Sequence, residues 1–211
     1  MSTVLYITSN PKSEKDSYSL KVGREFLNAY KIKNPGDNIF EIDTFKAGVP
    51  LIDKDVLKGW SRMASGTSFG VLTTDEQQKI KKIDKFTDQF IAADKYIFVT
   101  PMWNFTVPAM MKAYIDTICI VNRTFKYTQN GAEGLLKGKK AVHIQASGGV
   151  YSEGPAKDFE MGNRYIKSIC MFLGITFDGS IFIEGIQADP NKANEILQGA
   201  TDLAVKTAET F

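Results

Sequence analysis

Cysteine and histidine, which often build metal or nucleophilic centres, are scarce in this sequence. Its 211 residues include two cysteines and one histidine. Cys119 and Cys170 lie far apart and lack metal-ligand spacing, so we expect no metal site. We expect both to remain free thiols without a redox role, as is usual in the reducing cytoplasm.

An excess of charge and a long apolar run are missing as well. Lysine and arginine total 26 against 24 acidic residues, for a formal net charge of +2. Such a balance predicts no nucleic-acid partner. No apolar run is long enough to cross a bilayer, and the opening MSTVLYITSN has neither a basic region nor a cleavage site. The sequence therefore predicts a cytoplasmic protein without a membrane partner.

Two nucleotide-binding motifs are also absent. Neither G-x-G-x-x-G nor G-x-x-x-x-G-K-[ST] occurs in the chain. Their absence argues against a standard dinucleotide fingerprint and against a P-loop NTPase. Any phosphate site in this chain has to be built from other groups.

What is present is an alternation of strand and helix patterns. Apolar, β-branched runs start at Thr3, Asn38, Lys95, Lys139 and Ser180. Helical spacing of apolar residues fills 18–31, 75–94, 107–119, 155–175 and 189–211. With 43% hydrophobic residues, the chain is expected to form one domain over residues 1–211. We expect an α/β fold with a doubly wound, five-stranded parallel sheet and helices on both faces.

Two stretches break this alternation. Residues 46–73 look irregular, and residues 122–138 read as a hairpin with turn chemistry at Asn130 and Gly131. Long insertions in a compact α/β domain are often functional, so both stretches are of interest.

Ligands of an open doubly wound sheet bind beyond the carboxyl ends of its strands, and three loops fall there. The first, TSNPKSEKDSYSL, places Ser9 at the end of a strand and Ser17 and Ser19 at a helix start. Hydroxyls and free N–H groups at a helix N-terminus can hold a phosphate without a metal. Serines at such positions also act simply as helix caps, and this loop alone does not decide between the two roles.

The second loop, TPMWNF at 100–105, combines apolar surface with an amide. Met102, Trp103 and Phe105 would form a wall for a flat heterocycle, and Asn104 would add a polar contact. The alternative is that these aromatic side chains pack in the core or at a dimer interface.

The third loop, QASGGVYSEGP, places Gly148 and Gly149 where the fourth strand ends. Adjacent glycines let the backbone approach a ligand closely, although loop glycines are common without one. Together the loops outline a phosphate end, a flat hydrophobic middle and a glycine-lined polar edge. That outline suits flavin mononucleotide (FMN) better than a sugar or a nucleoside triphosphate.

Four further residues outside the three loops invite a functional interpretation. His143 lies inside the buried run AVHIQA, away from its end, so we interpret it as structural. Trp60 is compatible with capping a site or with packing at a dimer interface. Arg62 and Lys58 are candidates for a basic group near a nicotinamide ribose.

Five short stretches, in this order, carry a family resemblance: TPMWNF (100–105), KAYID (112–116), TFKYTQNGAEGLL (124–136), GGVYSEGP (148–155) and FLGI (172–175). With them the chain resembles, nearly end to end, the FMN-dependent NADH-azoreductases, which are flavodoxin-like NAD(P)H:quinone oxidoreductases. The resemblance implies a flavodoxin-like fold with bound FMN and with NADH as co-substrate.

The resemblance also implies roles for residues of the three loops. The FMN phosphate would be held by Ser9, Ser17, Tyr18 and Ser19. The ribityl chain and isoalloxazine would lie along Met102, Trp103, Asn104 and Phe105. The pyrimidine edge would face Ala146, Ser147, Gly148 and Gly149. The substrate would be surrounded by Phe105, Tyr127 and Phe172. Family members are homodimers with two sites at the interface, so Tyr127 and Phe172 would serve either their own flavin or the partner's.

The implied reaction is a ping-pong hydride transfer. NADH would reduce FMN, and a quinone would then be reduced to a hydroquinone, or an azo compound cleaved to amines, in the same place. FMN would carry the chemistry, so no catalytic side chain is expected. The alternative is a flavodoxin-type FMN electron carrier without a small-molecule substrate. Such carriers tend to be strongly acidic, whereas this chain is near neutral, which favours the enzyme.

Overall fold

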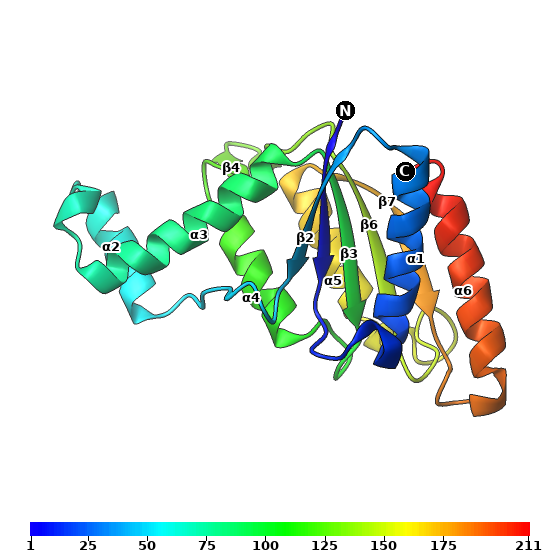
Figure 1. Ribbon diagram of the computed structural model, residues 1–211. Coiled ribbons are helices and arrows are strands. Elements are labelled where there is room, and N and C mark those ends of the chain that lie inside the picture. The colour runs from blue at the N-terminus through cyan, green and yellow to red at the C-terminus, as the bar shows by residue number, and fades with distance from the viewer.

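The centre of the computed structural model, which describes all 211 residues, is a parallel sheet. Its strands are β1 (Thr3–Thr8), β2 (Asn38–Asp43), β3 (Lys95–Pro101), β6 (Lys140–Ala146) and β7 (Thr176–Ile183). They lie in the order β2-β1-β3-β6-β7, and every neighbouring pair is parallel. All five arrowheads therefore point to one end of the molecule (Figure 1). The predicted five-stranded parallel sheet is confirmed.

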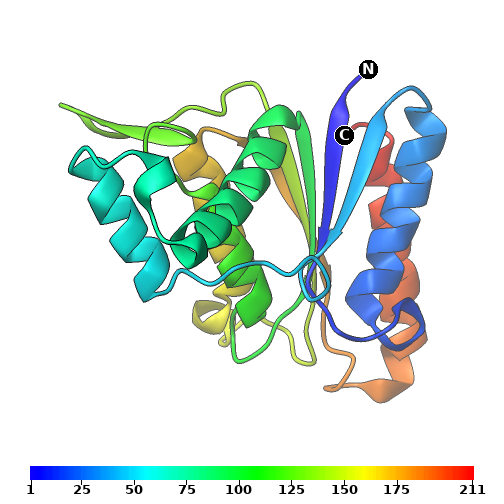
Figure 2. The ribbon, with the colours of Figure 1, turned by 60° about the vertical axis from the view of Figure 1, so that its left-hand side comes forward.

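Helices cover both faces of the sheet, as predicted (Figure 2). One face carries α1 (Tyr18–Lys33) and α6 (Ala193–Ala208), and the other carries α3 (Thr74–Ala92), α4 (Ala109–Ile118) and α5 (Gly162–Leu173). Successive strand residues point to opposite faces. In β1, for example, Val4 joins the core beneath α1 and α6, while Leu5 joins the core on the other side. The strands β1, β3 and β6 are buried on both faces, and such a strand reads as a continuous apolar run, which is why these three were visible in the sequence.

The prediction that residues 46–73 are irregular is wrong in part, because α2 (Lys54–Ala64) lies within them. Asp53 caps this helix, and its carboxylate accepts hydrogen bonds from the N–H groups of Asp55 at 3.0 Å and Val56 at 3.2 Å. The helix packs on α3 beyond the edge of the sheet (Figure 1). It buries only Val56 and Gly59, so its sequence carries a weak core-facing pattern.

One helix boundary also differs from prediction. The helix expected over 155–175 begins at Gly162, because residues 157–159 form a single 3₁₀ turn instead. The buried carboxylate of Glu160 caps α5 by accepting hydrogen bonds from the N–H groups of Asn163 at 2.7 Å and Arg164 at 3.1 Å. A glutamate at this place is not one of the usual N-cap residues, which explains the error.

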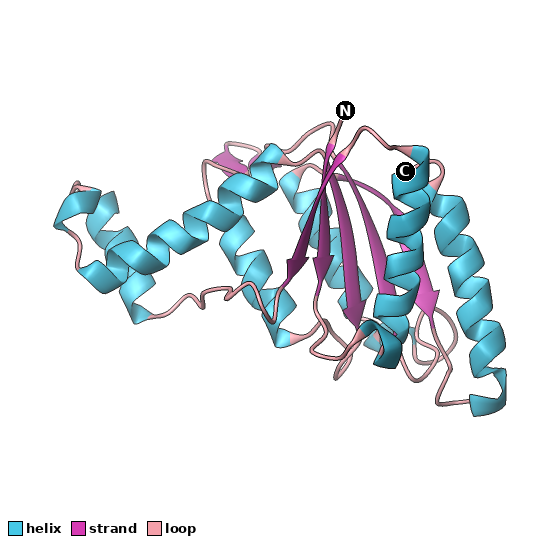
Figure 3. Cartoon of the chain, viewed as in Figure 1, coloured by secondary structure: helices cyan, strands magenta, loops and turns pink.

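The predicted hairpin is confirmed. It consists of the antiparallel strands β4 (Phe125–Thr128) and β5 (Gly131–Gly134), with Gly131 at a φ of 103°. A Cβ on Gly134 would lie 2.2 Å from the backbone of Leu173, so the hairpin packs directly on the end of α5. In Figure 3 the hairpin lies apart from the main sheet, at the end opposite the arrowheads.

None of the helices combines the length and the apolar composition needed to cross a bilayer.

Candidate functional site

A cavity of about 280 Å³ opens where the strands end. Its walls come from the segments that follow β1, β3, β6 and β7, which is the place where an open α/β sheet binds ligands. The lining residues are Asn10, Lys12, Asp16, Ser17, Tyr18, Ser19, Pro101, Met102, Trp103, Ala146, Ser147, Gly148, Ile186 and Gln187.

The three loops singled out in the sequence thus meet around one cavity. Eight of the residues expected there line it: Ser17, Tyr18, Ser19, Met102, Trp103, Ala146, Ser147 and Gly148. Sequence reasoning missed Asn10, Lys12 and Asp16, which share the first loop with the serines. It also missed Ile186 and Gln187, although they follow the fifth strand and the same edge rule would have found them.

Four expected residues do not line the cavity. Ser9 is fully buried behind its wall, where its Oγ accepts a hydrogen bond from Thr44 Oγ1 at 2.9 Å. Gly149 lies one step further along the third loop, and its carbonyl accepts a hydrogen bond from Ser147 Oγ at 2.8 Å. Asn104 and Phe105 lie at the tip of the neighbouring turn, beside the cavity.

The polar end of the cavity is the start of α1. Ser17 is its N-cap, and the Ser17 Oγ accepts hydrogen bonds from Leu20 N at 3.3 Å and from Asn10 Nδ2 at 2.8 Å. Ser19 Oγ lies 3.2 Å from Ser17 Oγ. The first N–H groups of a helix have no partner within it, and the helix dipole favours an anion there. Ser17 is therefore both a cap and a part of the cavity wall.

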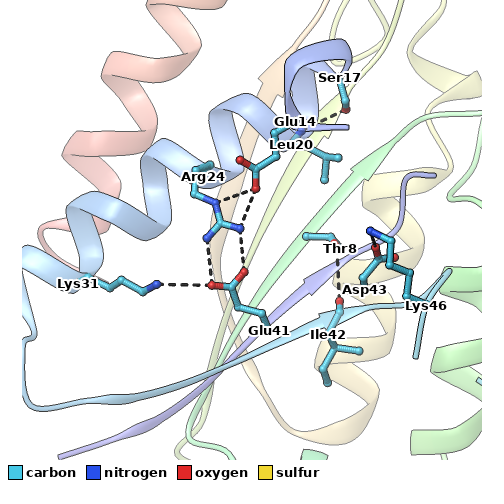
Figure 4. A network of polar contacts seen from close by, with 10 residues as sticks. All are labelled: Thr8, Glu14, Ser17, Leu20, Arg24, Lys31, Glu41, Ile42, Asp43 and Lys46. Atoms are coloured by element: carbon cyan, nitrogen blue, oxygen red, sulfur yellow. Dashed lines mark hydrogen bonds and ion pairs between the residues drawn. The ribbon is translucent and has the colours of Figure 1, made fainter. Parts of the chain in front are cut away.

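An ion-pair network holds this end in place (Figure 4). Arg24 of α1 donates to Glu14 Oε1 at 2.8 Å and, bidentately, to Glu41 on β2 at 3.0 and 2.8 Å. These hydrogen bonds raise the pKa of Arg24 and lower that of Glu41. Glu14 belongs to the 3₁₀ turn Glu14–Asp16 directly before α1, so the network ties the loop before the helix to the sheet edge.

The aromatic end of the cavity is a tight turn. Trp103 and Thr106 exchange backbone hydrogen bonds of 2.8 and 3.1 Å across Asn104 and Phe105. Both residues in the turn have positive φ, 47° at Asn104 and 71° at Phe105. Asparagine adopts this region more readily than most residues, whereas a bulky residue such as phenylalanine is strained there. Further hydrogen bonds hold the turn, from Met102 N to Ala146 O at 2.7 Å and from Met161 N to Phe105 O at 2.9 Å.

This turn explains why the aromatic side chains of the second loop do not pack in the core. Trp103 and Phe105 keep 41% and 42% of their surface exposed. Phe105 packs against Phe159, with ring centroids 5.1 Å apart, and Trp103 against Phe45 at 6.3 Å. The turn therefore presents a supported aromatic surface beside the polar end.

Comparison with known proteins agrees with this arrangement. A family model described as the flavodoxin-like fold matches residues 2–207. The chain belongs to this flavodoxin-like family.

Curated relatives of this flavodoxin-like chain match it from end to end. An FMN-dependent NADH:quinone oxidoreductase of Bacillus velezensis is 49% identical over 212 residues, covering 100% of both chains. The FMN-dependent NADH:quinone oxidoreductase 2 of Bacillus subtilis (strain 168) is 48% identical, again over 100% of both chains.

Solved structures give the same match. An azoreductase from Bacillus anthracis str. Sterne has a TM-score of 0.92 at 37% identity, covering 100% of both chains. An FMN-dependent NADH-azoreductase from Bacillus anthracis str. Ames Ancestor, crystallised in complex with FMN, has a TM-score of 0.92 at 35% identity. It matches over 100% of this chain and 99% of its own.

His143 lies beneath the site of this flavodoxin-like chain, as a buried structural residue. Its ring nitrogens bond to Thr100 Oγ1 at 2.9 Å and to Asn163 Oδ1 at 3.0 Å, so it joins β3, β6 and α5. Burial lowers its pKa to about 4, which keeps the ring neutral near pH 7. The two thiols are free, and burial raises the pKa of each to about 12, so neither is a ready nucleophile.

The three aromatic residues expected around a substrate are not brought together within one chain. Phe105 contacts the start of α5, whereas Phe172 and Tyr127 lie at its far end, both against Phe125, with centroids 4.6 and 5.6 Å away. Residues 161 to 172 rise about 16 Å along the helix. Tyr127 and Phe172 therefore lie outside this chain's own cavity.

The basic candidates on α2 also lie outside the cavity lining. Arg62 Nη1 donates to the buried Glu76 Oε2 at 2.9 Å, which joins α2 to α3. The geometry of this chain therefore gives Arg62 a role in packing.

Proposed function

We propose that this protein is an FMN-dependent NADH:quinone oxidoreductase that also cleaves aromatic azo bonds. The observation that carries the proposal is the single cavity in which a polar helix start, an aromatic turn and a glycine-bearing loop meet. Full-length relatives at 48–49% identity bear the name of such an enzyme, and structures with a TM-score of 0.92 bear the name azoreductase. These matches do not favour the alternative of a flavodoxin-type electron carrier.

The residues present fit FMN. Two buried hydroxyls, Ser17 and Ser19, and the first N–H groups of α1 line the polar end, and Lys12 adds a positive charge that takes part in no ion pair. Met102 and Trp103 supply apolar surface for a flat ring. At Gly148 a Cβ would lie 2.3 Å from Gln187 Oε1, so a larger residue would collide with Gln187 at this wall of the cavity. A phosphate and an aromatic ring thus each meet suitable groups.

Specific roles follow from this fit. In the proposal Ser17, Tyr18 and Ser19 bind the FMN phosphate, and Ser9 supports them from behind the wall. Residues 102–105 lie along the ribityl chain and the isoalloxazine, and residues 146–149 face its pyrimidine edge.

FMN, when bound, supplies hydride transfer between NADH and the acceptor. The chain binds and orients the reactants. The neutral His143 and the two thiols, whose pKa values are raised, offer no acid, base or nucleophile to the cavity. Asp16 lines the cavity, but its carboxylate accepts a hydrogen bond from Ser13 at 2.6 Å. Protons therefore come from solvent in this proposal.

A second copy of the chain completes the substrate site in this proposal. Tyr127 and Phe172 are exposed at the opposite end of α5 from Phe105, together with Met171, which is 63% exposed. An exposed apolar surface of this kind is typical of a subunit interface. In a homodimer, Tyr127 and Phe172 would reach the partner's flavin. The measurement that checks this is the molar mass in solution, with a monomer as the contrary result.

We further propose that residues 1–211 act as one FMN-binding domain in the cytoplasm. Two free cysteines suit a reducing compartment, and NADH is available there.

The test uses purified protein reconstituted with FMN, without air. NADH should bleach the visible flavin band, and a quinone or an azo dye should restore it. A bound flavin that NADH does not bleach would indicate an electron carrier that needs a partner reductase. Protein that binds no FMN would contradict the assignment of the cavity.

A further inference from the structure

A second cavity, of about 290 Å³, opens beside the aromatic turn and has no assigned role. Its walls come from the third loop, the 3₁₀ turn before α5, the first half of α5 and the end of β7. The lining residues are Tyr151, Ser152, Lys157, Glu160, Asn163, Arg164, Lys167 and Phe182. We call this cavity the basic pocket, because three of these residues are cations and only one is an acid.

None of the three cations, Lys157, Arg164 and Lys167, takes part in an ion pair. A weak contact joins two of them, from Arg164 Nη2 to the backbone carbonyl of Lys157 at 3.4 Å. The carboxylate of Glu160 is buried and engaged elsewhere, since it accepts hydrogen bonds from Gln145 Nε2 at 2.9 Å and from two N–H groups of α5. The positive charge of the pocket is therefore neutralised only in part within the chain.

The loop wall of the basic pocket is held by a second carboxylate, that of Glu184. It accepts hydrogen bonds from Tyr151 N at 3.1 Å, from Ser152 N at 3.0 Å and from Ser152 Oγ at 2.6 Å. These bonds fix the loop in place and occupy the carboxylate, so Glu184 pairs with none of the three cations.

Asn163 adds a neutral donor to the pocket. Its Oδ1 accepts a hydrogen bond from Ser180 Oγ at 2.7 Å and lies 3.0 Å from His143 Nδ1. Its Nδ2 bonds to no group of the chain, although the residue lines the pocket. An amide NH₂ only donates, so it suits an anion better than a cation.

Two of the cations lie where a helix disfavours positive charge. Arg164 is in the first turn of α5 and Lys167 is in the second, whereas the last turn carries no basic residue. The helix dipole is positive at its start, so cations are stabilising at the other end. Residues that break such a rule without a structural gain are expected at functional sites. A ligand of negative charge would account for their position.

The basic pocket adjoins the aromatic turn through two rings. Tyr151 lines the pocket and packs edge-on against Phe105, with ring centroids 6.0 Å apart. Phe159 ends the 3₁₀ turn that begins with Lys157, and it packs on the same Phe105 at 5.1 Å. A flat molecule on the aromatic turn can therefore place an attached anionic group in the pocket.

We propose that the basic pocket binds an anionic group of a reactant whose ring lies on the aromatic turn. The inference rests on the proposed function and adds a subsite to it. NADH carries a diphosphate, and an aromatic acceptor can carry a sulfonate or a carboxylate. Arg164 matches the forked geometry of such oxyanions, and the two lysines add point charges. The pocket selects reactants by charge, whereas the turn accepts flat rings of any charge.

Arg164→Gln combined with Lys167→Gln tests the pocket. Stopped-flow absorbance of the flavin band follows the two half-reactions separately. The second-order rate constant for NADH, for a naphthoquinone sulfonate, or for both should fall about tenfold at low ionic strength. Dihydronicotinamide riboside, which has no phosphate, and the uncharged naphthoquinone should react as they do with the wild type.

The two anionic reactants distinguish the sources of the anion. A loss confined to NADH assigns the pocket to the diphosphate, and a loss confined to the sulfonate assigns it to the acceptor. A loss with both means that they share it. Unchanged rates with both would overturn the proposal. Equal losses with the uncharged reactants would also overturn it, because they would indicate a structural effect.

Lys33→Gln combined with Lys206→Gln is the matched control. It removes the same charge from two exposed lysines in the last turns of α1 and α6, neither of which is in an ion pair. All four reactants should react as they do with the wild type. A tenfold loss in this control would show that the overall charge attracts the reactants, and it would overturn the proposal.

Thermal unfolding of the apo-proteins gives a readout that needs no reaction. Removing cations from the positive end of α5 should leave the stability unchanged or raise it slightly. A lower unfolding temperature would assign the cations a structural role, against the proposal. Wild-type protein whose bound flavin is not bleached by NADH would contradict the proposed function itself, which is a separate outcome.

Discussion

The two ends of the cavity are built in opposite ways. The polar end consists of buried side chains that bond to one another, with Asn10, Ser17 and Ser19 each at most 5% exposed. The aromatic end is a strained turn whose Trp103 and Phe105 remain about two-fifths exposed. One end is fixed by the interior of the protein, and the other is offered to solvent.

This difference suits a protein that keeps one ligand and exchanges others. A buried, fully bonded polar end holds its ligand in one position, because each polar group there would otherwise lack a partner. An exposed aromatic end can stack successive flat molecules through similar contacts. The following experiments are ordered from the largest expected effect to the smallest.

The largest effect is expected from acid, which should lower the free energy of unfolding through His143. The ring of this residue contacts Thr100, shortly before the aromatic turn. The pKa of His143 is about 4 in the folded protein and lies below the ordinary value of 6.5. The unfolded chain therefore takes up a proton first, and stability falls as the pH drops from about 6.5 to about 4. The loss should be on the order of 3 kcal/mol. Urea unfolding at pH 7 and pH 4 measures it, and His143→Gln should show a flatter dependence. Parallel curves for the two proteins would exclude His143 as the cause.

Loosening the loop before α1 should affect only the polar end. Arg24→Leu removes the hydrogen bonds that hold Glu14 and Glu41. FMN affinity should fall about tenfold as the loop loses its fixed position. Lys31→Leu is the control, because Lys31 contacts Glu41 only at 3.5 Å. A tenfold loss in both variants, or in neither, would contradict the assignment of Arg24 as the anchor.

Relieving strain should affect only the aromatic end. Asn104 has a φ of 47°, which glycine tolerates and alanine does not. Asn104→Gly should therefore be about 1 kcal/mol more stable than Asn104→Ala. Both variants lose the amide and should bind FMN more weakly or turn over more slowly without unfolding. Thermal unfolding of the apo-proteins compares the two, and equal stability would mean that the turn stores no strain.

The smallest effect is expected for a substitution in the exposed hairpin. Tyr127 is 73% exposed and belongs to the hairpin. Tyr127→Ala should raise the KM for an aromatic acceptor about threefold, at the low end of aromatic contact energies. Its affinity for FMN should not change. Loss of the flavin in this variant would place the hairpin at the polar end and remove the contrast between the two ends.

The sequence predicted the frame of the molecule better than its details. The central strands β1, β3 and β6 and the hairpin were visible because fully buried strands and turn residues leave strong local patterns. Helix α2 was not, because it covers only α3 and buries two residues, Val56 and Gly59. Glu160 was missed as a cap because it bonds to the helix from a buried position that no local pattern marks.

The same holds for the site. Ser17, Ser19 and Gly148 were found because a helix start and a strand end mark them in the sequence. Asn10 lies in the same first loop, but no capping pattern marks it. Gln187 follows the fifth strand, where the rule about strand ends applies although no motif marks the residue. Ser9 was expected to contact the ligand, but in this structure it is fully buried outside the cavity lining, where it accepts a hydrogen bond from Thr44 Oγ1.

The topology of the sheet has a consequence for how the chain folds. Parallel neighbours cannot be joined by a tight turn, and the one antiparallel pair, β4 and β5, lies outside the sheet. Strand β1 reaches its place beside β3 only when Val4 meets Lys95. Such distant pairing makes folding slow compared with that of a helical bundle of similar length. On the ribosome, β1 and β2 leave together, but β1 gains its second neighbour only after residues 95–101 have been synthesised.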